Sequence, residues 1–264
     1  MLTQQFLKSR TSTREFKENE LSEVALEKLN KFLKEEAITD NSKVRFYIAT
    51  NGNEVYKGLQ GLAGYRGVMI KAPAYVGLNI LEDDPRLIIE GSYALEQLIT
   101  YANELGLGTC WVTLNDVEER VKYPLFDCVA GSLPVMLAIG YPLDDNKREH
   151  KYSDRLANSD LVFIDSLGNE ASDEELEQRG LSELFDYAKY APSSYNAQPW
   201  RFLIEDDVLS LYIKDFKADE NLMDAGIIMY YIDELGKNFS LNTTWDINPK
   251  IEGDTYTFIA SKNL

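Results

Sequence analysis

Residues 21–37 read LSEVALEKLNKFLKEEA, and residues 44–50, which follow closely, read VRFYIAT. The first stretch places apolar side chains every three or four positions, which predicts a helix, and the second is typical of a strand. The same pair returns later in the chain. Residues 181–191 (LSELFDYAKYA) begin with the same three letters, and residues 200–206 (WRFLIED) again place Arg-Phe at the start of a strand. A helix–strand unit that occurs twice predicts two similar halves.

The match continues in the same order along the rest of the chain. Each half next contains a long apolar helix, then a further strand-like segment, and ends in a strand. The additional matched pairs are 90–106 with 222–236 and 134–142 with 255–261. We therefore predict one folded unit, 1–264, composed of pseudo-symmetric halves at about 1–155 and 156–264. The alternative is a chance similarity between helix–strand units.

The composition restricts the class of protein. The chain has 264 residues, of which 44% are apolar, so it can bury a sizeable core. It contains no run of about 18 apolar residues, and its first residues, MLTQQFLKSR, lack the apolar stretch of a signal peptide. We therefore expect a cytoplasmic protein that does not enter a membrane. The net charge of −17 argues against nucleic acid as a partner, because that binding depends on a basic surface.

The counts of cysteine and histidine argue against a metal site and a hydrolytic triad. The chain has two cysteines and one histidine, with no CxxC or HExxH pattern. His150 lies in the polar run DDNKREHKY, which is typical of an exposed surface. Cys110 could be a redox thiol or a small core residue, and the lack of a resolving cysteine nearby favours the core. We predict no metal and no catalytic side chain.

The two halves differ in their polar segments. The first half opens with SRTSTREF (9–16), and the second carries PSSYNAQP (192–199) between a helix and a strand. At the matching places, ITDNSK (38–43) and NSDLVFI (158–164) lack these groups. Each half therefore retains one segment suited to a polar ligand. A bound phosphate would need such a local arginine cluster, because the chain as a whole is acidic.

Four motifs in order resemble the nitroreductase family of flavin enzymes. They are SRTSTREF, GLGTCW (106–111), IGYP (139–142) and APSSYNAQPW (191–200). The resemblance implies an α+β fold with antiparallel or mixed sheets and surrounding helices. Members of that family are homodimers with FMN at the interface, and this chain is similar to the subgroup that fuses both protomers into one polypeptide. The resemblance thus implies a monomer with an internal pseudo-dimer and one FMN between its halves.

By this resemblance, the N-terminal motif holds the nucleotide end of FMN. Arg10 is assigned to the phosphate, since a guanidinium matches phosphate oxygens well, and Ser12 and Arg14 to the ribityl and pyrimidine side. Lys147 and Arg148 follow the IGYP motif and could also meet the phosphate, although KREHK is equally a plausible exposed turn. Arg66 or Lys71 could meet the pyrimidine edge. The alternative for the N-terminal motif is a solvated basic terminus.

The loop of the second half is expected to approach the flavin from the opposite side. Pro192 should end the preceding helix, because its ring blocks further helix. The resemblance places Pro192, Ser193 and Ser194 against the flavin. Asn196 and Gln198 either bond the ligand or brace the loop backbone. Trp200 is expected to pack beneath the loop, because a large ring that opens a strand usually serves the core.

The resemblance also implies a backbone donor just after the GLGTCW motif (106–111). In the family, an N–H just after this stretch reaches flavin N5, and Thr113 and Leu114 are the matching positions. The implied function is an FMN-dependent oxidoreductase that passes electrons from NAD(P)H to a small organic acceptor, such as a nitroaromatic compound or a quinone. The alternatives are a flavin carrier or regulatory protein without turnover, and an interaction protein that has lost the cofactor.

Overall fold

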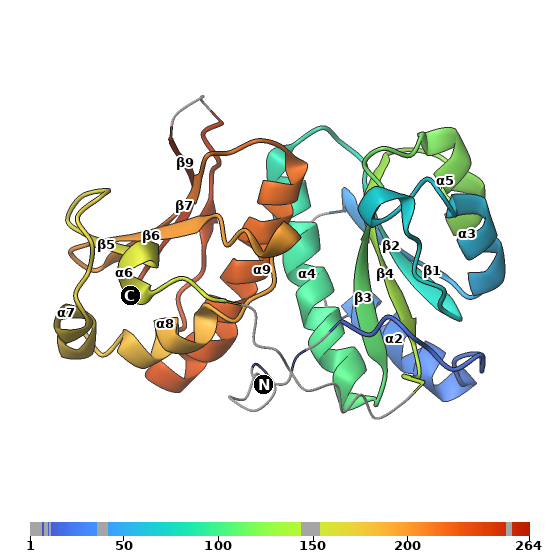
Figure 1. Ribbon diagram of the computed structural model, residues 1–264, viewed down its shortest axis with the longest axis horizontal. Coiled ribbons are helices and arrows are strands. Elements are labelled where there is room, and N and C mark those ends of the chain that lie inside the picture. Colours follow the sequence, from blue (N-terminus) through green and yellow to red (C-terminus); the bar gives the residue numbers. More distant parts are fainter. Residues whose placement is uncertain (1–6, 8–9, 11, 36–41, 144–153, 252–254) are drawn as a thin grey trace. The chain divides into compact units, whose positions relative to one another are not determined.

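The structure is a computed structural model that describes residues 7, 10, 12–35, 42–143, 154–251 and 255–264. It divides into two compact units (Figure 1). The N-terminal unit is Thr11–His150, and the C-terminal unit is Lys151–Leu264 together with Met1–Arg10. The division falls a few residues before the predicted one, and it places Arg10 with the second half of the chain.

The N-terminal unit contains a four-stranded antiparallel sheet in the order β1-β2-β4-β3. The strands are β1 (Val44–Ala49), β2 (Ala74–Ile80), β3 (Gly108–Thr113) and β4 (Ser132–Gly140). All seven residues of β2 are buried, as are eight of the nine in β4. Both central strands therefore have covered faces, and β3 is an edge strand.

Helices cover this sheet (Figure 1). They are α2 (Glu23–Glu35), α3 (Gly52–Leu59), the 3₁₀ turn η1 (Tyr65–Gly67), α4 (Pro85–Glu104) and α5 (Glu119–Phe126). The central helix α4 begins at a favourable cap, because Asp84 accepts a hydrogen bond from the Arg86 N–H at 3.0 Å and Pro85 occupies the first turn. Helix α2 packs on α4 through the stacked rings of Phe32 and Tyr101, whose centroids are 4.6 Å apart.

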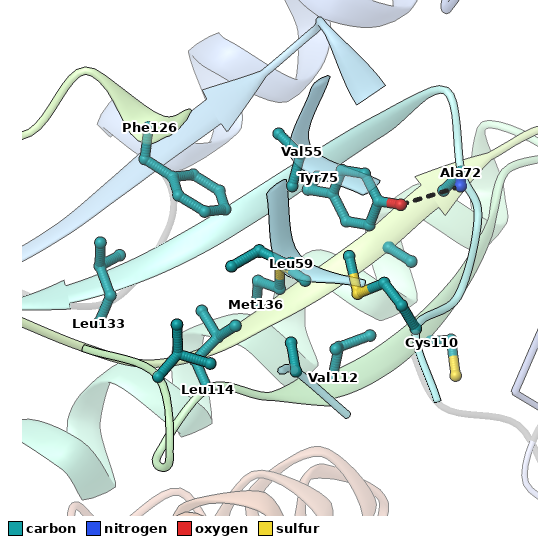
Figure 2. Close-up of a cluster of buried hydrophobic side chains, with 14 of the residues drawn as sticks. Val55, Leu59, Ala72, Tyr75, Cys110, Val112, Leu114, Phe126, Leu133 and Met136 are labelled. Carbon is teal, nitrogen blue, oxygen red and sulfur yellow. Dashed lines mark hydrogen bonds between the residues drawn. The ribbon is translucent and has the colours of Figure 1, made fainter. Parts of the chain in front are cut away.

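A hydrophobic core lies between the sheet and helices α3 and α5 (Figure 2). Its members include Val55, Leu59, Phe126 and Met136. Tyr75 is fully buried there; its hydroxyl donates to the Ile70 carbonyl at 2.6 Å, and burial raises its pKa to about 12. The core also contains Cys110, which is buried and forms no disulfide. The prediction that this cysteine packs as a small core residue is confirmed.

The C-terminal unit contains a five-stranded sheet in the order β5-β6-β7-β9-β8. Strand β5 runs parallel to β6, and the other neighbours are antiparallel. The strands are β5 (Val162–Ile164), β6 (Trp200–Glu205), β7 (Val208–Lys214), β8 (Asp246–Ile247) and β9 (Tyr256–Asn263). The helices are α6 (Asn158–Leu161), α7 (Asp173–Gln178), α8 (Ser182–Ala188), η2 (Ser194–Asn196), α9 (Asp219–Gly236) and η3 (Lys237–Phe239).

The two units share a strand order. The order is β1-β2-β4-β3 in the N-terminal unit and β6-β7-β9-β8 in the C-terminal unit, so in both the last two strands exchange places relative to the sequence. In both units a long helix, α4 or α9, comes before the first of these two strands in sequence, β3 or β8. The predicted α+β class with two sheets and surrounding helices is confirmed. The shared order supports the predicted repeat, whose symmetry stays a prediction.

The units differ where the sequence comparison expected a match. Residues 158–164 form α6 and β5, which pairs with β6, whereas the described residues from Ser12 to Phe16 form no strand and contact their sheet through isolated pairings such as the bridge between Phe16 and Pro142. A hairpin joins β6 directly to β7, but α3 and η1 separate β1 from β2. The periodicity argument had not identified β7, α3, α5 or α7.

A glycine allows the N-terminal motif to lie against β3. The Thr13 N–H donates to the Thr109 carbonyl at 2.9 Å, and the Lys17 N–H donates to the Tyr141 carbonyl at 2.8 Å. A Cβ on Gly108 would lie 2.2 Å from Thr13 Oγ1 and 2.7 Å from Thr13 Cβ. Only glycine therefore permits this approach, which explains a glycine in the GLGTCW motif.

We expect Gly108→Ala to destabilise the protein by about 1–3 kcal/mol, because the new methyl group must displace Thr13 and the backbone that carries it. Urea denaturation would measure the change. The control is Gly58→Ala in α3, where a Cβ would meet only the end of the Leu125 side chain at 3.0 Å and helix propensity improves. Equal losses in both variants would contradict the proposed close contact.

Candidate functional site

The outer edge of β3 presents backbone groups away from the sheet. Leu114 donates its N–H to the Pro134 carbonyl at 2.8 Å, so this residue pairs toward β4. Successive residues of an antiparallel strand alternate in direction, so the N–H and C=O of Thr113 point away from β4. Two contacts agree with this parity: the Thr113 carbonyl accepts the Gly64 N–H, and the Thr109 carbonyl accepts the Thr13 N–H, each at 2.9 Å.

This parity corrects one of the two candidate N5 donors. The Leu114 N–H is committed to Pro134, and the residue is 1% exposed, so its N–H cannot reach a ligand. The Thr113 N–H lies on the outer edge of β3, and Thr113 is half-buried. The sequence had left both residues open, because the register of β3 against β4 was unknown.

Polar and basic residues lie near both ends of this edge in the chain. Ser12, which is half-buried, and Arg14, which is exposed, flank Thr13 and so lie beside Thr109. Arg66 is exposed in the η1 turn, two residues after Gly64, with its guanidinium 5.2 Å from the centre of the Tyr65 ring. The edge from Thr109 to Thr113 spans about 13 Å at the usual rise of a strand.

The tryptophan of the GLGTCW motif is fixed to the central helix. The Trp111 indole N–H donates to Glu96 Oε1 at 2.9 Å, and Glu96 is 1% exposed on α4. A buried carboxylate in an otherwise apolar helix requires such a donor. Glu96 was missed by the motif comparison, although an acidic residue inside the apolar run 90–106 was a visible signal.

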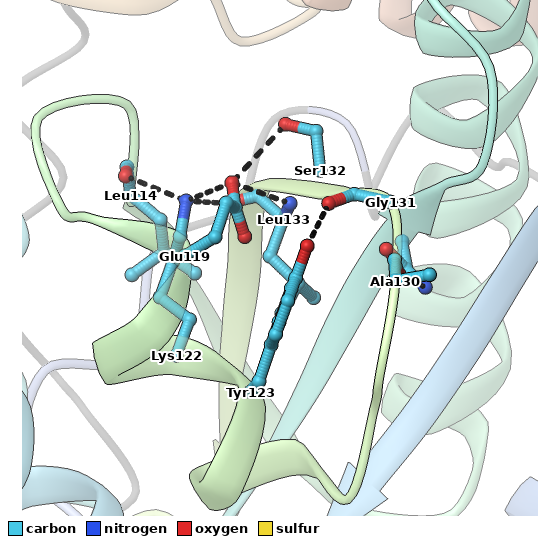
Figure 3. A network of polar contacts seen from close by, with 9 residues as sticks. Leu114, Glu119, Lys122, Tyr123, Ala130, Gly131, Ser132 and Leu133 are labelled. Atoms are coloured by element: carbon cyan, nitrogen blue, oxygen red, sulfur yellow. Dashed lines mark hydrogen bonds and ion pairs between the residues drawn. The ribbon is translucent and has the colours of Figure 1, made fainter.

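A buried lysine holds the chain just after Thr113 (Figure 3). Lys122 is 2% exposed, and its ammonium contacts three acceptors from two segments of the chain and its own helix. It donates to the Leu114 carbonyl at 3.3 Å and the Leu133 carbonyl at 2.8 Å, and it pairs with Glu119 Oε1 at 2.7 Å. The ammonium therefore joins the end of β3 to the start of β4 beside the candidate donor. Sequence alone had not singled out this lysine.

We expect Lys122→Met to destabilise the protein by about 2–3 kcal/mol, because two carbonyls and a partly buried carboxylate lose their shared donor. Thermal or urea unfolding would measure this. Arg120→Met is the matched control, since Arg120 pairs with Glu118 on the exposed surface of the same helix and should change stability by less than about 1 kcal/mol. A loss no greater than that of the control would contradict the network's role.

The predicted loop of the second half has an unusual backbone. Helix α8 ends at Ala188, so Pro192 does not terminate it directly, as had been expected; a turn of three residues intervenes. Tyr195, Asn196 and Gln198 have φ values of 54°, 56° and 47°. Each left-handed non-glycine residue costs about 1–2 kcal/mol. Contacts with the rest of the unit must therefore hold this loop.

The two amide side chains provide part of that hold. Gln198 is 5% exposed; its Oε1 accepts the Leu156 N–H at 3.0 Å, and its own backbone N–H donates to Ser193 Oγ at 2.9 Å. Asn196 donates through Nδ2 to the Asp154 carbonyl at 3.0 Å. Of the two roles left open by the sequence, bracing the loop is observed for both amides. A ligand contact by either one stays a prediction.

Arg155 braces the same loop and had been missed. Its guanidinium donates to Asn196 Oδ1 and, at 3.2 Å, to the Tyr190 carbonyl. Burial lowers the pKa of this arginine, and the neighbouring Tyr231 and Tyr190 raise it by a smaller amount. The comparison of halves had treated residues 158–164 as the counterpart of the arginine-rich motif, and so overlooked an arginine three residues earlier.

A buried carboxylate on α9 also contacts the loop. Asp224 in α9 is 2% exposed, and its Oδ1 accepts the Ser194 N–H at 2.8 Å. Burial raises the pKa of Asp224 to about 7, against the opposing effect of the Ser194 N–H. Trp200 is fully buried, so the prediction that it packs in the core is confirmed.

The remaining sequence candidates are distributed as follows. Pro192, Ser193 and Ser194 are half-buried in the loop, and Arg10 is half-buried in the C-terminal unit. Lys147, Arg148 and His150 lie outside the described residues. In the described part of the chain, no helix is both long and apolar enough to cross a membrane, and no cluster of three or more His, Cys, Asp or Glu could hold a metal ion.

Comparison with known proteins identifies the class. A family model described as "Putative TM nitroreductase" matches residues 3–234, so the chain belongs to this nitroreductase family. A crystal structure of a "putative nitroreductase" from Thermotoga maritima is 19% identical, with a TM-score of 0.61 over 97% of this chain and 92% of that one. This likeness establishes a nitroreductase-like fold.

Two further solved structures have lower TM-scores and cover less of this chain. NfrA1 nitroreductase from B. subtilis is 16% identical, with a TM-score of 0.49 over 67% of this chain and 78% of that chain. An FMN-dependent nitroreductase from Clostridium difficile is 21% identical, with a TM-score of 0.45 over 59% of this chain and 92% of that chain. No curated protein gives a significant match.

Proposed function

We propose that this chain is an FMN-dependent oxidoreductase that takes electrons from NAD(P)H and passes them to a small organic acceptor. The observation that carries the proposal is the outer edge of β3. It presents the Thr113 N–H, and the polar N-terminal motif runs beside the same edge. Membership of the nitroreductase family supports the flavin as ligand. A soluble, cytoplasmic setting is part of the proposal.

The donor set along this edge fits the chemistry of FMN. The nucleotide has an anionic phosphate, a hydroxyl-bearing chain and a flat ring with polar atoms on one side. Ser12 and Arg14 supply a hydroxyl and a cation beside Thr109, and Arg66 supplies a second exposed cation near Thr113. Because the net charge of the protein is −17, an anionic ligand needs local cations such as these to bind.

The residues of this chain would bind and orient the cofactor without acid–base chemistry of their own. When bound, the flavin supplies hydride acceptance and release at N5. Thr113 would fix the ring through its N–H, and Lys122 would keep the chain after Thr113 in place through the Leu114 carbonyl. Arg10, Ser12 and Arg14 would hold the phosphate and ribityl end, and Lys147 or Arg148 could add a further phosphate contact.

We further propose that the loop Pro192–Gln198 completes the same site and that the chain binds one FMN as a monomer. The support is the division of polar segments between the halves, since each half keeps one, together with the shared strand order. Pro192, Ser193 and Ser194 would face the ring, and the braced amides of Asn196 and Gln198 would keep the loop in shape. A carrier or regulatory protein that binds FMN without turnover is the second candidate.

We expect the purified protein to be yellow and to saturate at one FMN per chain by calorimetric titration. Mixing with NADH or NADPH should bleach the flavin absorbance within seconds in a stopped-flow instrument. Binding without bleaching by either nicotinamide would favour the carrier. A stoichiometry near two would contradict the single site, and no FMN binding would contradict the whole proposal.

We expect Arg10→Ala to weaken FMN binding by roughly 1.5–3 kcal/mol, or about 10- to 150-fold, because a charge-assisted phosphate contact is lost. Fluorescence titration would measure the affinity. Arg120→Ala, which removes an exposed arginine from α5, should leave it unchanged. Retained affinity in Arg10→Ala would rule out the phosphate role.

A further inference from the structure

The turn η2 (Ser194–Asn196) is held on helix α9 by Asp224. The Ser194 N–H donates to Asp224 Oδ1 at 2.8 Å, and the side chain is 2% exposed. The second carboxyl oxygen, Oδ2, is also buried and has no hydrogen-bond partner among the described residues. A charged carboxylate with one unsatisfied oxygen is costly in such a place.

No cation compensates Asp224 in the described part of the chain. Arg155 contacts the same turn through Asn196 and the Tyr190 carbonyl, but the described ion pairs do not include one between Arg155 and Asp224. The like charge of Glu220, one turn earlier on α9, also raises the pKa of Asp224, whereas the Asn221 side-chain amide lowers it. The groups that act on Asp224 thus come from α9 and the turn, and none of those identified comes from α8, η3, β6 or β7, which also pack on α9.

The backbone of the turn stores strain that its contacts must offset. Tyr195, Asn196 and Gln198 all have positive φ. A turn of this kind opens more readily than a relaxed one when one of its contacts weakens. If it opens, Asp224 gains access to water, and its proton affinity should fall toward that of an ordinary aspartate.

We propose that Asp224 is a positioning residue for the Pro192–Gln198 loop: its neutral carboxyl allows the turn to close on α9, and its ionisation favours the open turn and weakens ligand binding there. The sign follows from linkage, because the closed form binds the proton more tightly than the open form. Closure is therefore fully favoured at low pH and is lost as the pH rises through the pKa of about 7. The ligand arm of this inference rests on the proposed FMN site.

The experiment measures FMN affinity from pH 6 to pH 8 in the full-length protein. We expect the dissociation constant of the wild type to rise by up to about tenfold over this range, since up to one proton is taken up for each turn that closes. Asp224→Asn, which is neutral at every pH and keeps the Oδ1 acceptor, should remove this increment. Asp219→Asn is the matched control, because Asp219 is exposed on the same helix; it should retain the wild-type profile.

A second measurement does not depend on the flavin. In the ligand-free wild type, the amide signal of Ser194 should titrate near pH 7, and its protection against hydrogen exchange, corrected for intrinsic rates, should fall above that pH. The same profiles in Asp224→Asn and wild type would overturn the inference while leaving the FMN proposal intact. If FMN does not bind at any pH, the function proposal fails, and the Ser194 amide still decides the role of Asp224. Should the Asp224→Asn variant fail to fold, the Ser194 amide still tests the role of Asp224, because that amide is measured in the wild type.

Discussion

The hydrogen bond from the Leu114 N–H to the Pro134 carbonyl determines what the N-terminal unit can present to a ligand. It sets the parity of the edge strand β3, and so it turns Thr109 and Thr113 outward. A shift of one residue would exchange the inward and outward groups and bury the candidate donor. The N-terminal motif and the glycine-rich turn near Arg66 both attach to this outward edge.

Each unit has one buried ionisable side chain beside its candidate loop, and the two side chains differ in how their polar atoms are satisfied. The Lys122 ammonium contacts two carbonyls and a carboxylate, so these contacts fix the side chain in one position. Asp224 has one bonded and one unsatisfied oxygen, and burial raises its pKa to about 7. A buried ionisable group whose hydrogen bonds are all made keeps the surrounding segments rigid. A group that is only partly hydrogen-bonded changes its protonation state more readily, and the segments that contact it respond to that change.

The shared strand order explains how the sequence repeat could be recognised and where it misled. Segments such as 44–50 and 200–206 matched because both become strands that begin their sheets' common order. The pairing of the basic motif with residues 158–164 followed position in sequence, but β5 is an added parallel strand with no equivalent among the described strands of the other sheet. Arg155 was overlooked for that reason, because its role depends on contacts with a loop about forty residues away.

The sequence by itself determined the α+β class, the long helices, the main strands and the family, because these depend on local periodicity and on short motifs. It also identified Cys110 and Trp200 as core residues from their chemistry. Only the tertiary structure showed that the Leu114 N–H pairs with β4 while the Thr113 N–H lies on the outer edge. It also gave Asn196 and Gln198 their bracing contacts, and it brought Lys122, Arg155 and Asp224 to the candidate loops. Those outcomes depend on strand register and on burial by distant segments, and neither quantity is encoded in the spacing of residues along the chain.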